Sequence, residues 1–521
     1  MADIVLINPA FDTSYWGLEH ALPFFGKRAN VPPASLPLLA ALTPSEHCVT
    51  LVDESVEKLD FDRIARADIV GITGMSVQRR RMREILEQVK ERGGGFAVVG
   101  GPWVTVQEDY FDEWADTIFV GEAEETWPRF LLDWEAGEHH ARYEQTQRSD
   151  MTRVPTPRFD LLKMHHYMFG SMQFSRGCPF QCEFCDIIVT FGRRPRLKTA
   201  AQVIGELEAL RAAKMEIVFV VDDNLIGNKA AIKSLLRDLA VWQRDNGYPL
   251  MFFTEASLDL SEDEELMRLM TEANFVSVFI GIESPNEASL RETKKFQNVR
   301  KGGSIVEKVR SVQKAGLDVW CGMILGFDHD DTTIFAAQKT FLEDARIAHA
   351  MIGILHAIPK TPLYDRLAAD GRLDYDDVPS YGTNVIPLGM SRDELTEGYV
   401  ELMRDVYSPA AYFSRVDDLF LDAGFRFAAP RAKYWRTHPW QGFKSQALSL
   451  VRFAGIYWRL MRMVTESSLR SEYRRRIFGL LRARRDPAVL FSYAVKCATH
   501  YHHHRLATEM SRGETAVINS F

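Results

Sequence analysis

The sequence has few cysteines and no long apolar run. Six cysteines in 521 residues, three of them crowded into one loop, do not make a disulfide framework, so reduced thiols are expected. No run of about 18 apolar residues is present to span a bilayer, and the opening residues MADIVLINPAF have the pattern of a strand rather than of a signal peptide. We therefore expect a cytoplasmic protein.

Composition and charge describe a soluble globular chain with an unusual C-terminal region. With 46% hydrophobic and 26% charged residues, 521 residues are expected to fold as about three domains. Residues 431–521 carry 17 Lys and Arg against 5 acids, a net charge of +12, which leaves −20 for the rest of the chain. This uneven distribution of charge predicts a basic surface in the last region and does not indicate a fold.

Residues 3–125 alternate short β-branched runs with helical patterns, which predicts an α/β, doubly wound parallel sheet over residues 1–140. No G-x-G-x-x-G follows the first strand, which argues against a nicotinamide-type Rossmann domain. Ligands of such sheets bind outside the carboxyl ends of the strands. The small or polar residues expected at those ends are Thr73, Gly74, Ser76, Gly100, Gly101, Gly121 and Glu122. Tight βα turns without a ligand are the alternative interpretation.

A second series of alternating strands and helices follows a connector at 141–167. The expected strands are SMQFS, EIVFVVDD, LMFFTEA, VSVFIGIES, VWCGMILGF and MIGILHAIP. Six such units predict a (β/α)6 partial barrel over residues 168–390, with its chemistry at the carboxyl ends of the strands. Residues 391–521 are predicted to form a basic helical domain.

The stretch FSRGCPFQCEFCD places Cys178, Cys182 and Cys185 directly after the first strand of this series. A tetrahedral zinc site or a cubane iron–sulfur cluster needs four ligands, so one position is left open. Thiolates suit both zinc and iron–sulfur clusters. Asp186 is a candidate fourth ligand of a zinc site, and this alternative stays open at the level of the residues.

The C-x3-C-x2-C spacing with Phe184 before the last cysteine resembles the radical S-adenosylmethionine (SAM) superfamily. The resemblance implies a [4Fe-4S] cluster on the three cysteines, with SAM on the fourth iron position. Three further strand ends resemble SAM-binding positions of that family, in VVDDNLIGN, IGIESPN and CGMILGF. They supply Asp222, Asp223, Asn224, Glu283, Ser284, Gly322, Ile324 and Gly326. Ordinary strand-end polar residues are the alternative for each of these positions taken alone.

A doubly wound domain fused to such a barrel resembles the cobalamin-dependent radical SAM enzymes. GLEHALPFFGKRANVPPASLPLLAAL, GMSVQRR and VDDNLIGN look most like the hopanoid C-2 methylase-like subgroup. The resemblance implies that the loops at 73–76 and 100–101 admit the nucleotide tail and corrin edge of cobalamin. The D-x-H-x-x-G motif of methionine synthases is absent, and His20 does not fit it, so cobalamin is expected without a histidine ligand to cobalt.

The resemblance implies a C-methyltransferase that acts on an unactivated carbon through a 5′-deoxyadenosyl radical and methylcobalamin. The cofactors carry the difficult bond changes, and no acid–base pair stands out, so no catalytic side chain is assigned. The implied partners are a small-molecule or lipid substrate and a low-potential electron donor of the flavodoxin or ferredoxin type. The alternatives are oxidation or cyclisation without methyl transfer, and a cobalamin- or cluster-based sensor.

The segment LVRFAGIYWRLMRMV in the basic C-terminal region mixes large apolar side chains with arginines at helical spacing. Basic amphipathic helices can lie at an anionic membrane surface, so peripheral contact with the inner membrane face is one interpretation. Packing on the barrel is the other. No RNA-binding module is recognisable, the pI is about 6.0, and no nucleic-acid partner is expected. The run HYHHH at 500–504 could bind a metal, but no second group of ligands stands nearby in the sequence, so it is interpreted as a polar helix end.

Overall fold

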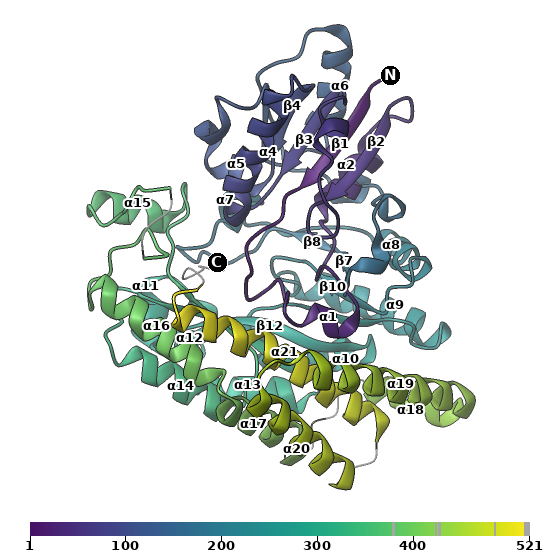
Figure 1. The fold of residues 1–521 in the computed structure, drawn as a ribbon, viewed down its shortest axis with the longest axis vertical. Helices are drawn as coiled ribbons and strands as arrows, with labels where there is room; N and C mark the ends of the chain where they lie inside the picture. The colour runs from purple at the N-terminus through teal and green to yellow at the C-terminus, as the bar shows by residue number, and fades with distance from the viewer. Residues whose placement is uncertain (378–380, 423–424, 426–428, 484–485, 515–521) are drawn as a thin grey trace. The chain divides into compact units, whose positions relative to one another are not determined.

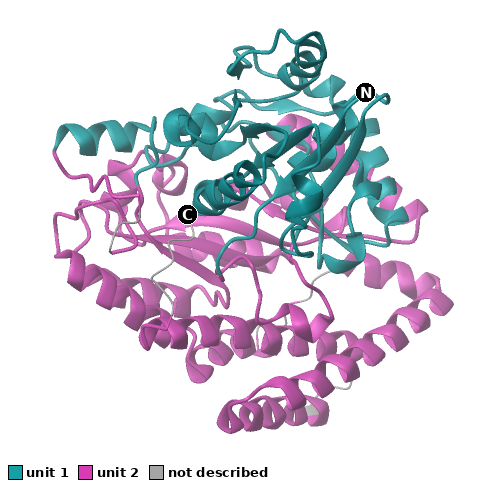
Figure 2. Ribbon diagram, turned by 45° about the horizontal axis from the view of Figure 1, so that its top comes forward, with its two compact units in different colours: residues 1–12, 31–228, 357–370 teal, residues 13–30, 229–356, 371–521 magenta. Residues whose placement is uncertain are grey.

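The computed structural model describes residues 1–377, 381–422, 425, 429–483 and 486–514 (Figure 1). The chain divides into two compact units, each built from several stretches of sequence (Figure 2). Unit 1 comprises residues 1–12, 31–228 and 357–370. Unit 2 comprises residues 13–30, 229–356 and 371–521.

The first sheet of unit 1 has the strand order β2-β1-β3-β4-β5-β6, and every pair is parallel. Its strands are β1 (Asp3–Asn8), β2 (Cys48–Asp53), β3 (Ile69–Thr73), β4 (Phe96–Gly100), β5 (Thr117–Val120) and β6 (Arg142–Glu144). The alternation expected over residues 3–125 is confirmed, since β1 to β5 all lie within it. The short edge strand β6 lies in the stretch that was expected to be a connector.

Helices cover this sheet because each presents one apolar face to the strands. They are α2 (Ser35–Leu42), α3 (Phe61–Ile64), α4 (Arg79–Glu91), α5 (Pro102–Val106) and α6 (Thr126–Ala136). In α4, Met82, Ile85 and Val89 are buried at a spacing of three and four residues, which is the period of a helix face. They share one core cluster with Val70 and Ile72 of β3.

The second series of strands also pairs in parallel and follows the order of the sequence. In unit 1, β7 (Gly170–Met172) pairs with β10 (Ile217–Val220), with α8 (Ala200–Ala212) between them in sequence. In unit 2, β11 (Met251–Glu255), β12 (Phe275–Glu283), β13 (Asp318–Leu325) and β14 (Ala350–Ile354) pair in succession. Their helices are α9 (Lys229–Asp245), α10 (Glu264–Glu272), α13 (Ile305–Lys314) and α14 (Ile334–Asp344). The expected alternation of strands and helices is confirmed.

The C-terminal region is helical, as expected. Its helices in unit 2 are α16 (Arg392–Val406), α17 (Pro409–Asp417), α18 (Ala429–Thr437), α19 (Pro439–Met463), α20 (Ser467–Ala483) and α21 (Pro487–Ser511). The long helices α19 and α21 pack against each other within this unit. Among the described residues, no helix is long and apolar enough to cross a bilayer.

Candidate functional site

The three-cysteine loop of unit 1 starts and ends on a short antiparallel pair of strands. This pair joins β8 (Ser175–Arg176) to β9 (Arg196–Leu197). Gly177 follows β8 with φ +97°, and a Cβ atom there would lie 2.9 Å from the carbonyl oxygen of Gly192. Only glycine fits this backbone position without a shift. The base of the loop is therefore closed by tight backbone packing.

The three cysteines differ in exposure but influence one another electrostatically. Cys182 is buried, and Cys178 and Cys185 are partly exposed. Burial raises the pKa of the Cys185 thiol, and the neighbouring Asp186, Cys182 and Cys178 raise it further. The side-chain amide of Asn224 lies 3.9 Å from the Cys178 sulfur.

The donor set of the loop consists of three thiols. In the described part of the chain, no group of three or more His, Cys, Asp or Glu side chains is placed to hold one metal ion. The soft, thiol-only composition of the loop matches the Cys ligands of an iron–sulfur cluster.

Two of the predicted SAM-binding carboxylates support the backbone that leads into the loop. Asp222 accepts hydrogen bonds from the amide N–H groups of Phe174 (2.7 Å) and Ser175 (2.8 Å), and Asp223 accepts one from Gly177 (2.7 Å). Burial raises the pKa of Asp222 to about 7 and that of Asp223 to about 6. In this structure both side chains hold the loop.

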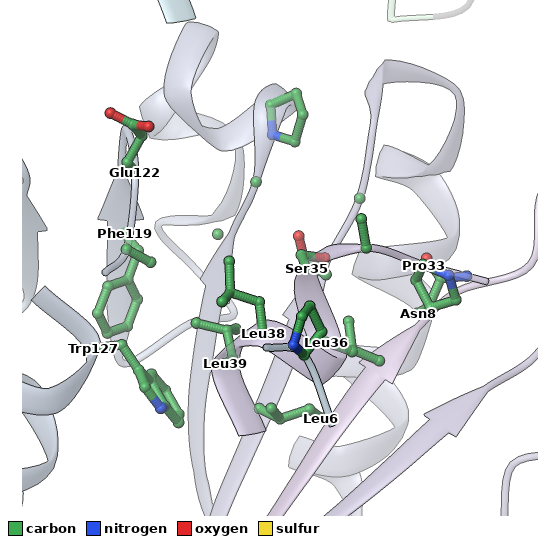
Figure 3. A pocket seen from close by; sticks show the side chains of 18 of the residues that line it. Leu6, Asn8, Pro33, Ser35, Leu36, Leu38, Leu39, Phe119, Glu122 and Trp127 are labelled. Atoms are coloured by element: carbon green, nitrogen blue, oxygen red, sulfur yellow. The ribbon is translucent and has the colours of Figure 1, made fainter. Parts of the chain in front are cut away.

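A cavity of about 460 Å³ lies within unit 1, between the carboxyl ends of the first sheet and the residues around β7, β8 and β10. Its wall is mostly apolar. Figure 3 shows Leu38 and Leu39 of α2 next to Phe119 and Trp127. Volume and lining are those of a small-molecule site with a few polar groups.

Most of the residues predicted at the ends of β3, β4 and β5 line this cavity. Those that line it are Thr73, Gly74, Gly100, Gly101, Gly121 and Glu122. A Cβ atom on Gly101, whose φ is +104°, would lie 2.5 Å from the Thr73 hydroxyl oxygen, so two strand ends approach closely here. Ser76 does not line the cavity.

A buried ion network forms the polar part of the wall. Arg176 lies 2.7 Å from a carboxylate oxygen of Glu122 and 2.5 Å from one of Glu124. Arg196 reaches Glu122 at 2.9 Å, and the amide of Ser149 donates to the same carboxylate at 3.0 Å. The predicted residue Glu122 thus joins the cavity to the strands that carry the three-cysteine loop.

A second buried pair, Lys198 and Glu206, also lines the cavity, and its two side chains form a hydrogen-bonded ion pair. Neither this pair nor Arg176 was predicted. Arg176 stands two positions before Cys178, and this closeness to the cysteines was the one available sequence signal. The carboxylate partners lie far away in sequence or on another element, so a single sequence does not reveal them.

Five other residues predicted to bind SAM lie in unit 2, in the second halves of β12 and β13 or directly after these strands. They are Glu283, Ser284, Gly322, Ile324 and Gly326. Glu283 has φ +66° and accepts a hydrogen bond from Lys295 at 2.6 Å. A Cβ atom on Gly322 would lie 3.7 Å from this carboxylate, which is ordinary van der Waals contact between the paired strands β12 and β13. The carboxylate of Asp330 accepts from the Gly326 amide at 3.1 Å.

The interpretation of HYHHH as a polar helix end is wrong. The run lies inside α21, and the rings of His500, His502 and His503 are fully buried. His503 stacks on Tyr15 with 4.4 Å between ring centroids. His20, which did not fit a cobalt-ligand motif, donates its backbone N–H to His502 at 3.3 Å. The histidines are part of an aromatic core of unit 2.

Two protein families match the sequence. The radical SAM superfamily matches residues 172–336, and a domain of unknown function (DUF4070) matches residues 361–516. The first match contains the three-cysteine loop and the strands β10 to β13. The second contains the C-terminal helices α16 to α21.

Two curated proteins are similar over most of their length. An uncharacterized methyltransferase of Synechocystis sp., sll1242, is 38% identical over 96% of this chain and 90% of its own. A hopanoid C-2 methylase of Rhodopseudomonas palustris is 34% identical over 80% of this chain and 78% of its own. The solved structure of the radical enzyme OxsB with cobalamin and SAM has a similar fold, with a TM-score of 0.60 and 14% identity over 99% of this chain and 81% of OxsB.

Proposed function

Since the chain belongs to the radical SAM methyltransferases, we propose that it uses cobalamin and methylates an unactivated carbon of a hopanoid-type lipid. The observation that carries the substrate class is the 34% identity to a hopanoid C-2 methylase over 80% of the chain. That similarity extends well beyond the radical SAM match at 172–336, so it includes parts of the chain outside the cluster loop.

The proposed cofactor sites use the residues described above. Cys178, Cys182 and Cys185 would hold a [4Fe-4S] cluster, because they form a thiol-only set in one loop whose base is fixed. The strand ends of 222–224, 283–284 and 322–326 would bind SAM. We keep the predicted domain limits in this proposal. They are 1–140 for the cobalamin-binding domain, 141–167 for the connector, 168–390 for the radical SAM partial barrel and 391–521 for the helical domain.

The nucleotide tail of cobalamin would occupy the 460 Å³ cavity. Small residues at the strand ends would let this tail lie close to the backbone. The glycines Gly74, Gly100 and Gly101 support this fit, because they line the cavity and place no side chain between the backbone and a bound group. None of the described residues that line the cavity is a histidine. This composition supports binding without a histidine ligand to cobalt.

When bound, the three groups supply the radical and the methyl group, and the protein contributes binding, position and exclusion of water. The leucines of α2, together with Phe119 and Trp127, give the cavity an apolar wall. Arg176 and Glu122 fix the cavity wall to the strand before the cluster loop. These side chains act by position and take no part in bond changes.

Two further partners belong to the same proposal. A low-potential donor of the flavodoxin or ferredoxin type would supply electrons to the cluster. The basic C-terminal region would make peripheral contact with a membrane, which suits a lipid substrate.

The test is anaerobic reconstitution with iron, sulfide, cobalamin, a reductant and SAM labelled in its methyl group, followed by mass spectrometry of extracted lipids. A hopanoid that gains one labelled methyl in place of hydrogen is the expected product. A product without label would contradict methylation and favour oxidation or cyclisation. The reconstituted protein is also compared with Cys182→Ala for release of 5′-deoxyadenosine. If the wild type releases no more than this variant, the result would favour a sensor.

A further inference from the structure

Helix α19 presents two opposite apolar faces, and only one of them is buried in unit 2. Phe453, Ile456 and Leu460 lie on the buried face, where they are 8%, 4% and 0% exposed. Large apolar side chains on the other face are 45–69% exposed. They are Trp440, Phe443, Leu448, Leu450, Val451 and Trp458. Figure 1 shows α19 running along the set of C-terminal helices.

The exposed side chains form one stripe rather than scattered positions. Trp440, Phe443, Val451 and Trp458, with the small exposed residues 447 and 454 between them, recur every three or four residues. This spacing places them on one side of a helix over about 27 Å, at 1.5 Å per residue. Single exposed apolar side chains are ordinary, but a continuous stripe marks an interaction surface.

The charge around the stripe is of one sign. Residues 429–463, which contain α18 and α19, carry seven Lys or Arg and no Asp or Glu. Lys444 lies over the ring of Trp440 at 5.3 Å, and Arg462 lies over that of Trp458 at 5.1 Å. Both cations are exposed, and neither makes an ion pair with a described carboxylate.

We propose that the outward face of α19 docks in the surface of an anionic phospholipid bilayer. The inference deepens the proposed function, on whose membrane contact it rests, by naming the surface and the lipid chemistry. Trp and Phe suit the boundary between headgroups and acyl chains, and Lys and Arg beside them suit anionic headgroups. A second copy of the same face is disfavoured, because it would bring two sets of cations together.

The position of the helix in the fold agrees with docking rather than insertion. The opposite face of α19 stays packed on α21, so the helix lies along the membrane surface. Trp440 and Trp458 stand about five turns apart on the stripe, which places one aromatic near each end of the contact. Such a helix holds the enzyme at the interface from which a lipid substrate is drawn.

The test is co-sedimentation of the full-length, cluster-loaded protein with vesicles of phosphatidylcholine and phosphatidylglycerol in equal parts. Trp440→Ser/Val451→Ser/Trp458→Ser is expected to lower the vesicle partition coefficient on the order of a hundredfold, because three apolar anchors are lost. The matched control is Leu132→Ser/Val241→Ser/Leu388→Ser, which removes exposed apolar side chains outside α19 and is expected to bind like wild type.

A charge variant separates the headgroup contribution from the apolar one. Lys444→Gln/Arg462→Gln is expected to bind roughly tenfold more weakly to vesicles with phosphatidylglycerol and nearly unchanged to phosphatidylcholine alone. Salt should reduce wild-type binding in the same direction, because it screens exposed charges.

Equal binding by the triple variant and its control, or no binding by wild type, would overturn the proposal. A wild-type dimer in sedimentation velocity that the α19 triple variant converts to a monomer would assign the face to a second copy instead. Methylation of detergent-dispersed substrate is measured in parallel. Because this assay needs no bilayer, it separates failure of docking from failure of the proposed methyl transfer.

Discussion

Arg176 donates a hydrogen bond to Glu122 over 2.7 Å, and the two side chains are 9% and 1% exposed. The pair joins the strand before the three-cysteine loop to the second residue after the carboxyl end of β5. A buried ion pair is weak evidence of net stabilisation, but breaking one side of it is costly. The pair therefore makes the cluster loop and the cavity wall dependent on each other.

Arg176→Met is expected to lower the free energy of unfolding by about 3–5 kcal/mol, because it leaves two buried carboxylates with fewer cations. The iron content after anaerobic reconstitution should fall as well, since the strand before the loop loses its anchor. Chemical denaturation and iron analysis measure the two effects. The control is Arg153→Met at a side chain that is 88% exposed, where a change within about 0.5 kcal/mol is expected. Equal stability of both variants would contradict the role of the pair.

Gly101→Ala tests the close approach of two strand ends in the cavity. At φ +104° the position favours glycine, and the added methyl would meet the Thr73 hydroxyl at 2.5 Å. We expect a loss of about 2–4 kcal/mol in stability and weaker cobalamin binding in an absorbance titration.

Gly137→Ala is the matched control for this substitution. Gly137 also has positive φ, +74°, but no atom lies within 4 Å of its Cβ position. Only the backbone strain of about 1 kcal/mol is expected there, with unchanged cobalamin binding. If the two variants behave alike, crowding at the strand ends is not what matters.

The strands were predictable because β-branched runs bounded by glycines are local signals, and parallel topology then places their carboxyl ends together. Thr73, Gly101 and Gly121 were found in this way and do meet at one cavity. The edge strand β6 was missed because its three residues, RYE, carry only one buried side chain, Tyr143. A pattern that short has no period to detect.

Contacts between distant segments were the part that the sequence did not reveal. Arg176 and Glu122 are 54 positions apart in the sequence. Each one, taken alone, would be interpreted as an ordinary charged residue on the surface. The histidines of HYHHH seemed polar for the same reason. His502 and His503 are covered by Ser14 and Tyr15, 488 positions away. His500 is buried against the side chains of Tyr412 and Tyr473.

The Lys198–Glu206 pair offers a double-mutant test of the cavity wall. Both side chains are nearly fully buried, at 4% and 2% exposure. Glu206→Leu alone should cost about 3–5 kcal/mol of stability, because it leaves a buried lysine without its partner. Lys198→Met/Glu206→Leu should recover most of this loss, since an apolar pair has no desolvation penalty. Denaturant unfolding of the single and double variants measures the coupling, and a double variant no more stable than the single one would contradict the prediction.

His502 should make unit 2 sensitive to acid. Its Nδ1 accepts the His20 amide at 3.3 Å, and its Nε2 lies 2.9 Å from the Ser14 carbonyl oxygen, so the folded site holds a neutral ring. Burial lowers the pKa of His502 to about 3, and His20 adds to the effect. The ring of His503 also faces it, at 5.1 Å.

The folded pKa of His502 lies below the unfolded value of about 6.5, so protonation favours unfolding. The neutral ring's contribution is fully present above pH ~6.5 and falls by roughly 1.4 kcal/mol per pH unit below it, about 2 kcal/mol by pH ~5. Because a glutamine side chain does not titrate in this range, His502→Gln should be less stable at neutral pH but lose less stability on acidification. Denaturant unfolding near pH 7 and pH 5 measures the difference between the two proteins. The exposed His140→Gln should retain the wild-type slope, and a slope in His502→Gln as steep as in wild type would show that other groups cause the acid sensitivity.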